Sequence, residues 1–133
     1  YNVLSGAIDL DTDSFKVALS NTAPDAAADD EFADITEISA GNGYTAGGQE
    51  VGNVSLAESG AGTGVWIWSF DDETFTASSG SIATFRYVII YSDTSTNDKL
   101  LCYLDYGSAL TITDGNSFTT DVGANGVIQF SEA

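Results

Sequence analysis

The chain has 133 residues, of which 43% are hydrophobic and 17% charged, a balance typical of a globular protein and not of a disordered one. Twenty Asp and Glu residues face only three cations, Lys16, Arg86 and Lys99, so the formal net charge is -17. Nucleic acids and anionic membrane surfaces are bound through clustered Lys and Arg, so the sequence predicts neither as a partner. A chain of this length predicts a single domain over residues 1–133.

The first motif along the chain is the alternating acid run Asp9, Asp11 and Asp13, a spacing with which calcium-binding loops begin. The sixth position of such a loop needs Gly and the twelfth needs Glu, but Ser14 and Ser20 occupy them. We therefore predict a solvated turn and no metal site. Residues 15–20 then alternate apolar with smaller or polar side chains, which predicts a strand with one buried face.

Three features follow before the centre of the chain. Residues 24–35 carry Pro at their start and several acids, so they are the one segment in which the sequence predicts a short helix. Residues 41–48 (GNGYTAGG) lack the Lys and the spacing of a phosphate-binding loop, and predict a turn whose glycines adopt unusual backbone angles while Tyr44 anchors it to the domain. A weaker strand is expected around residues 49–57.

The central segment, residues 65–70 (VWIWSF), predicts a strand covered on both faces. Its period of two places Trp66, Trp68 and Phe70 on one face and Val65 and Ile67 on the other. Packing into the core is the favoured interpretation of both tryptophans, and the alternative is an exposed shelf for stacking on carbohydrate.

Residues 85–92 and 99–106 are apolar on both faces and flank a polar loop, so we expect two antiparallel neighbours. A second hairpin is predicted from residues 110–113 and 117–120, because Asp114-Gly115-Asn116 supplies the positive φ angles of tight turns. A last strand is expected at residues 127–130.

Together these elements predict an all-β fold, an antiparallel β-sandwich of jelly-roll or immunoglobulin-like type with at most one short helix. The side chains expected to form its core are Trp66, Trp68, Phe85, Ile89, Leu100, Leu104 and Phe130.

Catalytic chemistry has little support in this composition. The chain has no His, which excludes Ser-His-Asp and Cys-His nucleophilic systems. Cys102 lies in an apolar run and is expected to pack as a small hydrophobe. Nothing marks two of the many carboxylates as a glycosidase pair. The sequence therefore predicts a protein that is not an enzyme, with no catalytic residue, no cofactor and no metal.

Several stretches in order resemble a widespread family of small virion structural proteins of tailed bacteriophages. The stretches that carry the resemblance are residues 6–13 running into 15–19, residues 41–48, residues 85–91, residues 104–108 and residues 126–128. Their order and spacing match over nearly the whole chain, and the specificity lies in the combination.

The resemblance implies a capsid decoration (cement) protein on the exterior of the virion. Its partners would then be the major capsid protein and copies of itself, in a symmetric oligomer for which a trimer is one option. It also implies an N-terminal anchoring arm, of which residues 1–5 would be the remaining part. A tail or tail-fibre module that binds a carbohydrate receptor is the alternative.

The candidate partner-binding residues are Tyr1, Asn2, Val3 and Leu4 in this arm, Tyr44 in the glycine-rich loop, and Arg86. For Arg86 the sequence leaves two interpretations open, an ion pair within the fold or a contact with an acidic partner.

Overall fold

A computed structural model describes residues 1–131. It confirms the all-β prediction, because antiparallel sheets pack together and the helical content of these residues is one 3-10 turn, η1 (Phe32–Asp34). The strands are β1 (Phe15–Ser20), β2 (Gln49–Glu50), β3 (Ser55–Glu58), β4 (Val65–Ser69), β5 (Glu73–Thr76), β6 (Ile82–Ser92), β7 (Leu100–Ile112), β8 (Ser117–Thr120) and β9 (Ile128–Ser131).

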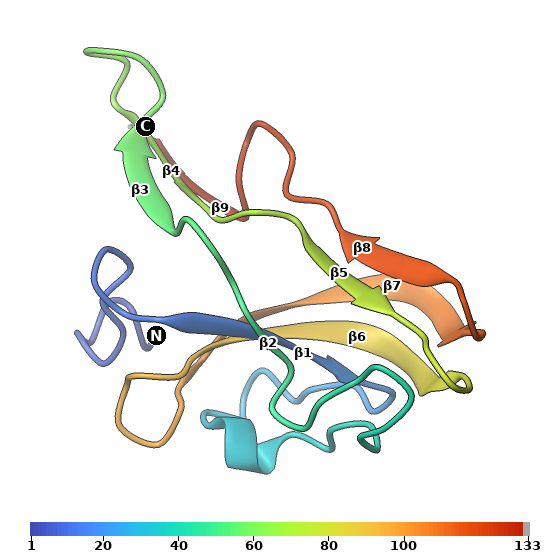
Figure 1. Ribbon diagram of the computed structural model, residues 1–133. Coiled ribbons are helices and arrows are strands. Elements are labelled where there is room, and N and C mark those ends of the chain that lie inside the picture. The colour runs from blue at the N-terminus through green and yellow to red at the C-terminus, as the bar shows by residue number, and fades with distance from the viewer. Residues whose placement is uncertain (132–133) are drawn as a thin grey trace.

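One layer of the sandwich is a four-stranded sheet in the order β2-β1-β6-β7 (Figure 1). As expected, β6 and β7 are antiparallel neighbours, with Val88 opposite Leu104. The inner face of the sheet forms the main core. The outer face is also covered, since Phe32 stacks on Tyr91 with ring centroids 4.2 Å apart and Ile35 packs against the same cluster. β1 and β6 are therefore buried on both sides.

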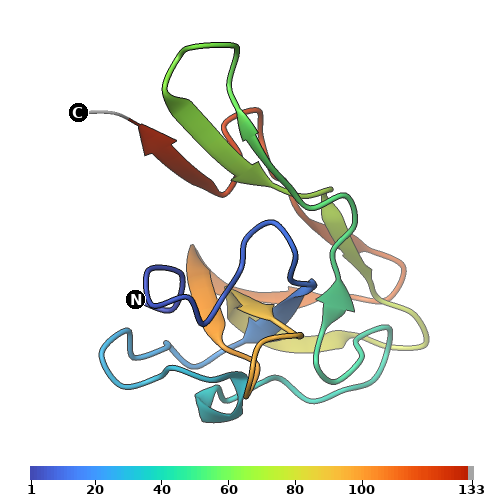
Figure 2. The same cartoon turned by 90° about the vertical axis from the view of Figure 1, so that its left-hand side faces the viewer.

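The second layer is a kinked ribbon. β4 continues into β5 and β8 into β9, with β5 paired to β8 and β4 paired to both β9 and β3. The β5–β8 half lies over the four-stranded sheet, where Phe118 meets Phe85 edge-on at 5.0 Å. The β3-β4-β9 half projects beyond the body of the domain (Figures 1 and 2). We call this half the projecting sheet.

This projection corrects the predicted core. Trp68, Phe85 and Ile89 are buried as expected, whereas Trp66, Leu104 and Phe130 are 47%, 42% and 41% exposed. Trp66 and Phe130 are exposed because the kink carries the ends of β4 and β9 away from any opposing layer, and Leu104 is exposed because it lies on β7 at the edge of the four-stranded sheet. Leu100 is only partly buried. The expectation that β4 is covered on both faces is therefore wrong.

Three predicted elements also differ. Residues 24–35 form no α-helix, because Asp25 and Asp34 accept hydrogen bonds from nearby backbone N–H groups and so compete with helical pairing. The expected strand at residues 49–57 is divided between β2 and β3, which belong to different sheets.

The predicted hairpin over residues 110–120 is a turn without a ladder. The N–H of Asn116 donates to the carbonyl of Thr113, and Gly115 has a φ of 78°. β8 pairs with β5 of the second layer, whereas residues 110–112 pair with β6 of the four-stranded sheet. The turn therefore connects the two layers.

Candidate binding pocket

The glycine-rich loop is anchored by Tyr44, as predicted. Its ring is buried, its hydroxyl donates to Glu37 Oε1 at 2.6 Å, and it accepts a hydrogen bond from the N–H of Leu19 at 3.0 Å. Burial, and then the hydrogen bond to the Glu37 carboxylate, raise the pKa of this phenol far above its ordinary value. Tyr44 therefore lies inside the domain, where a partner would reach it only if the loop moved.

Arg86 forms an ion pair within the fold. Its Nε and Nη2 donate to the two carboxylate oxygens of Asp105 at 2.7 and 2.8 Å, and its guanidinium lies over the ring of Tyr87. The hydrogen bonds from Arg86, followed by one from the N–H of Gly107, lower the pKa of Asp105 to about 2. The sequence left two interpretations of Arg86 open, and the structure shows the ion pair within the fold.

The N-terminal segment forms a compact turn. Asn2 is buried, and its Nδ2 donates to the carbonyl of Leu100 at 2.9 Å. The carbonyl of Asn2 accepts hydrogen bonds from the N–H groups of Ala7 and Ile8. Tyr1 and Leu4 project almost fully into solvent. Asn2 thus docks the segment against β7 and leaves two apolar side chains available for contact.

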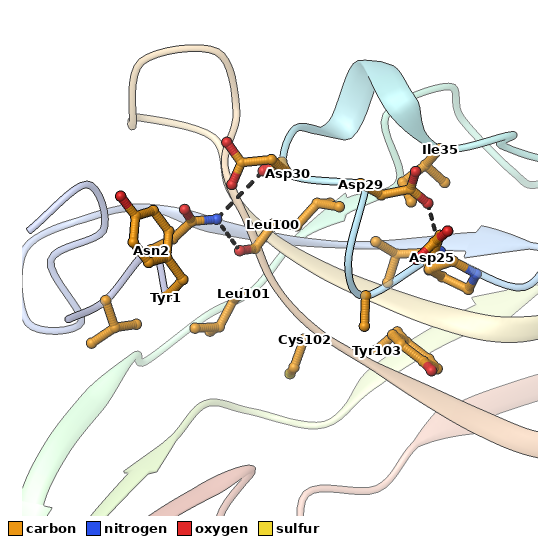
Figure 3. Close-up of a pocket in the computed structure, with 14 residues that line it drawn as sticks. Tyr1, Asn2, Asp25, Asp29, Asp30, Ile35, Leu100, Leu101, Cys102 and Tyr103 are labelled. Atoms are coloured by element: carbon orange, nitrogen blue, oxygen red, sulfur yellow. Dashed lines mark hydrogen bonds between the residues drawn. The ribbon is translucent and has the colours of Figure 1, made fainter. Parts of the chain in front are cut away.

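This docking creates a pocket of about 340 Å³ between the N-terminal turn, the loop of residues 24–30 and the outer face of β7 (Figure 3). Figure 3 shows the N-terminal residues on one side and the loop carboxylates on the other, with β7 between them. The residues that line it are Tyr1, Asn2, Val3, Pro24, Asp25, Ala26, Asp29, Asp30, Ile35, Ile89, Leu100, Leu101, Cys102 and Tyr103.

The rim of the pocket is acidic and its floor is apolar. Asp29 accepts a hydrogen bond from the N–H of Asp25 at 2.8 Å, and Asp30 pairs with Lys99 at 2.5 Å. The contact with Lys99, followed by one with Asn2, lowers the pKa of Asp30 below its usual value. This arrangement suits a neutral or cationic group with an apolar body, such as a basic side chain of another protein.

The one thiol of the pocket lining belongs to Cys102. Burial raises the pKa of the Cys102 thiol to about 11, so near neutral pH the sulfur is protonated and weakly nucleophilic. Within residues 1–131, no three His, Cys, Asp or Glu side chains are placed to hold a metal ion. The acid run Asp9, Asp11 and Asp13 forms a local turn, as predicted, in which Asp9 Oδ1 accepts hydrogen bonds from the N–H groups of Asp11 and Thr12.

The pocket is lined by residues that no feature of the sequence placed together. Val3, Asp30 and Leu101 come from distant segments, and no motif connects them. The one available signal was the pair of acids Asp30 and Glu31, both of which contact Lys99 in the structure.

Comparison with known proteins yields no match to a family model, to a curated protein or to a solved structure. In the part of the chain that the structure describes, no helix is long and apolar enough to cross a membrane.

Proposed function

We propose that the protein is a non-enzymatic structural component of a tailed-phage virion, a capsid decoration protein that binds the outer face of the major capsid lattice and stabilises it. The observation that carries the proposal is the ordered set of family-like stretches in the sequence. In the fold, residues 41–48 are pinned to β1 through Tyr44 and residues 85–91 lie in the central strand β6. The resemblance thus concerns the elements that build the scaffold.

The charge distribution supports an outward position on a particle. All three cations are engaged within the chain: Lys16 with Asp93, Arg86 with Asp105, and Lys99 with Asp30 and Glu31. Their pairing leaves the surface strongly acidic. Such a surface repels packaged DNA and tolerates exposure to solvent.

Self-association has a suitable surface on β7. Residues 100–112 contain a single charged side chain, Asp105, which Arg86 neutralises. Tyr103 and Leu104 are exposed on this strand, on opposite faces of an edge of the sheet. Copies of the chain can therefore meet here without strong repulsion, and an oligomer would engage several capsid subunits at once, each contact raising the effective concentration for the next.

Copy number in purified virions tests the proposal. Quantitative mass spectrometry is expected to find the protein in near-stoichiometric ratio to the major capsid protein, and heads without it are expected to lose DNA at lower temperature. A few copies per particle would rule out the head location, and unchanged heat resistance of heads lacking the protein would argue against stabilisation.

The second candidate is a tail or tail-fibre module that binds a carbohydrate receptor. The half-exposed Trp66 favours it, because exposed aromatic rings stack on sugars. Glycan-array binding that is lost in Trp66→Ala would support this function, together with a low copy number per virion.

A further inference from the structure

The inner face of the projecting sheet and the N-terminal loop enclose an apolar groove of about 500 Å³. The residues that line it are Val3, Gly6, Ile8, Asp9, Leu10, Leu56, Trp66 and Phe130. Seven of these eight are apolar or Gly, so the groove offers one side-chain charge, that of Asp9. We call it the aromatic groove.

The groove exists because other parts of the chain cover only a portion of the inner face of the projecting sheet. Trp66 and Trp68 share one face of β4, and Trp66 lies directly opposite Phe130 on β9. Trp68 is fully buried, with its Nε1 donating to the carbonyl of Leu10 at 2.9 Å and its ring edge-on to Phe15 at 4.8 Å. Two residues earlier on β4, Trp66 is about half exposed, and so is its cross-strand neighbour Phe130.

The charges beside the groove are acidic. Asp9 lines it, and Glu58 lies opposite Trp66 in the register of β3 and β4. No cation of this chain neutralises them, since Lys16, Arg86 and Lys99 are paired with other carboxylates. A positively charged group at this edge must come from another molecule.

We propose that the aromatic groove binds an extended segment of a different protein, in which apolar side chains alternate with Lys or Arg. The apolar side chains pack on Trp66 and Phe130, and the basic side chains lie beside Asp9 and Glu58. A half-exposed Trp in an apolar patch is the kind of residue that dominates the energy of protein interfaces. The proposal is independent of the virion assignment.

Two other occupants fit less well. A second copy of this chain has no unpaired Lys or Arg to place beside Asp9 and Glu58, since all three cations are engaged in ion pairs of their own. A sugar needs several polar partners around the aromatic platform, and the groove lining supplies the Asp9 carboxylate as its one polar side chain.

Acrylamide quenching of tryptophan fluorescence tests the proposal, because Trp66 is accessible to the quencher and Trp68 is not. The probe is a synthetic seven-residue peptide that alternates Lys with Leu. It is expected to shield Trp66 from acrylamide, with an effect that weakens as salt is added. Matched peptides with Glu in place of Lys, or Ser in place of Leu, are expected to bind at least about tenfold more weakly.

Two variants locate the binding. Phe130→Ala is expected to weaken the binding of the Lys/Leu peptide by at least about fivefold. Ile67→Ala is the matched control, since it removes an apolar side chain from the opposite face of β4 and is expected to leave affinity unchanged. Circular dichroism checks the fold of both, and calorimetric titration of Trp66→Ala gives a second readout that needs no fluorescence from this residue.

Several outcomes would overturn the proposal. Equal binding of the Lys/Leu and Lys/Ser peptides would reduce the effect to general charge attraction. Equal loss of affinity in Phe130→Ala and Ile67→Ala would place the peptide elsewhere. Shielding of Trp66 by oligosaccharides and not by the peptide would make the groove a glycan site. A dimer in sedimentation that Phe130→Ala dissociates would make the occupant a second copy.

Discussion

The hydroxyl of Tyr44 donates to Glu37 Oε1 at 2.6 Å, and the same carboxylate oxygen accepts the N–H of Gly47 at 2.6 Å. One carboxylate thus holds both the aromatic anchor and the backbone of the glycine-rich loop. We expect Tyr44→Phe to lower the free energy of unfolding by about 1–3 kcal/mol, because Glu37 and the N–H of Leu19 each lose a partner. Chemical denaturation measures this, with Tyr106→Phe, which is exposed, as the near-neutral control.

The raised pKa of Tyr44 also predicts a pH dependence. A phenol whose pKa is higher in the folded than in the unfolded state contributes its full stability below the unfolded value, near 10.0, and loses it as the pH rises further. Unfolding midpoints are therefore expected to fall above pH 10 less steeply in Tyr44→Phe than in the natural protein. Identical slopes in the two proteins would contradict the burial of this hydroxyl.

Gly48 has a φ of 76°, and a Cβ at this position would overlap the backbone carbonyl of Val17. Gly62 has nearly the same angle, 75°, with open space around it. We expect Gly62→Ala to cost about 1 kcal/mol of stability through backbone strain alone, and Gly48→Ala to cost clearly more. Thermal melting of the two variants separates strain from steric overlap, and equal melting temperatures would show that the loop is not pressed against β1.

The two tryptophans of β4 predict unequal costs of truncation. Trp68→Ala is expected to lower the free energy of unfolding by about 3–5 kcal/mol, because it empties a fully enclosed site. Trp66→Ala is expected to cost about 1 kcal/mol or less, and Leu104→Ala likewise less than a core substitution, since both side chains are largely solvated. Chemical denaturation measures both costs. If the two tryptophan variants had the same denaturant midpoint, Trp66 would have to be buried like Trp68.

The Arg86–Asp105 pair predicts the titration of one carboxylate. In the natural protein Asp105 is expected to titrate near pH 2, and in Arg86→Ala its pKa is expected to rise toward the ordinary 3.8. NMR of the side-chain carboxyl carbon measures both. Because the pKa is lowered in the fold, any stability from this pair is present above pH 4 and is lost as the pH falls toward 2. A pKa of Asp105 that is the same in both proteins would mean that the pair does not persist in solution.

The strand pattern was predictable for physical reasons that are local. Apolar side chains alternate with others in residues 15–20 and are nearly continuous in residues 85–92. Short segments of either kind between turn residues are typical of buried strands, and the structure has β1 and β6 there. The role of Tyr44 followed in the same way, because glycines on both sides leave one large side chain to hold the loop. The family-like stretches coincide with these locally encoded elements.

The candidate site was not predictable, since its parts meet only through long-range packing. Asn2 reaches the carbonyl of Leu100 across 98 positions. The loop of residues 24–30 is held at β7 by two further long-range contacts, the hydrogen bond from the N–H of Leu100 to the carbonyl of Asp30 and the ion pair of Asp30 with Lys99. A turn at residues 113–116 was evident from the sequence. The sequence did not show that the strand after this turn pairs with β5 of the other layer and not with β7.

The sequence by itself determined the fold class, the acidic surface and the lack of histidine chemistry, because composition and period-two patterning act residue by residue. Only the tertiary structure decided which apolar faces are covered. Trp66 and Trp68 have the same pattern and the same face of one strand, yet the kink between β4 and β5 buries Trp68 under Leu10 and Phe15 and leaves Trp66 in a groove. A period of two specifies which side chains share a face, whereas the presence of an opposing layer depends on where distant strands pack.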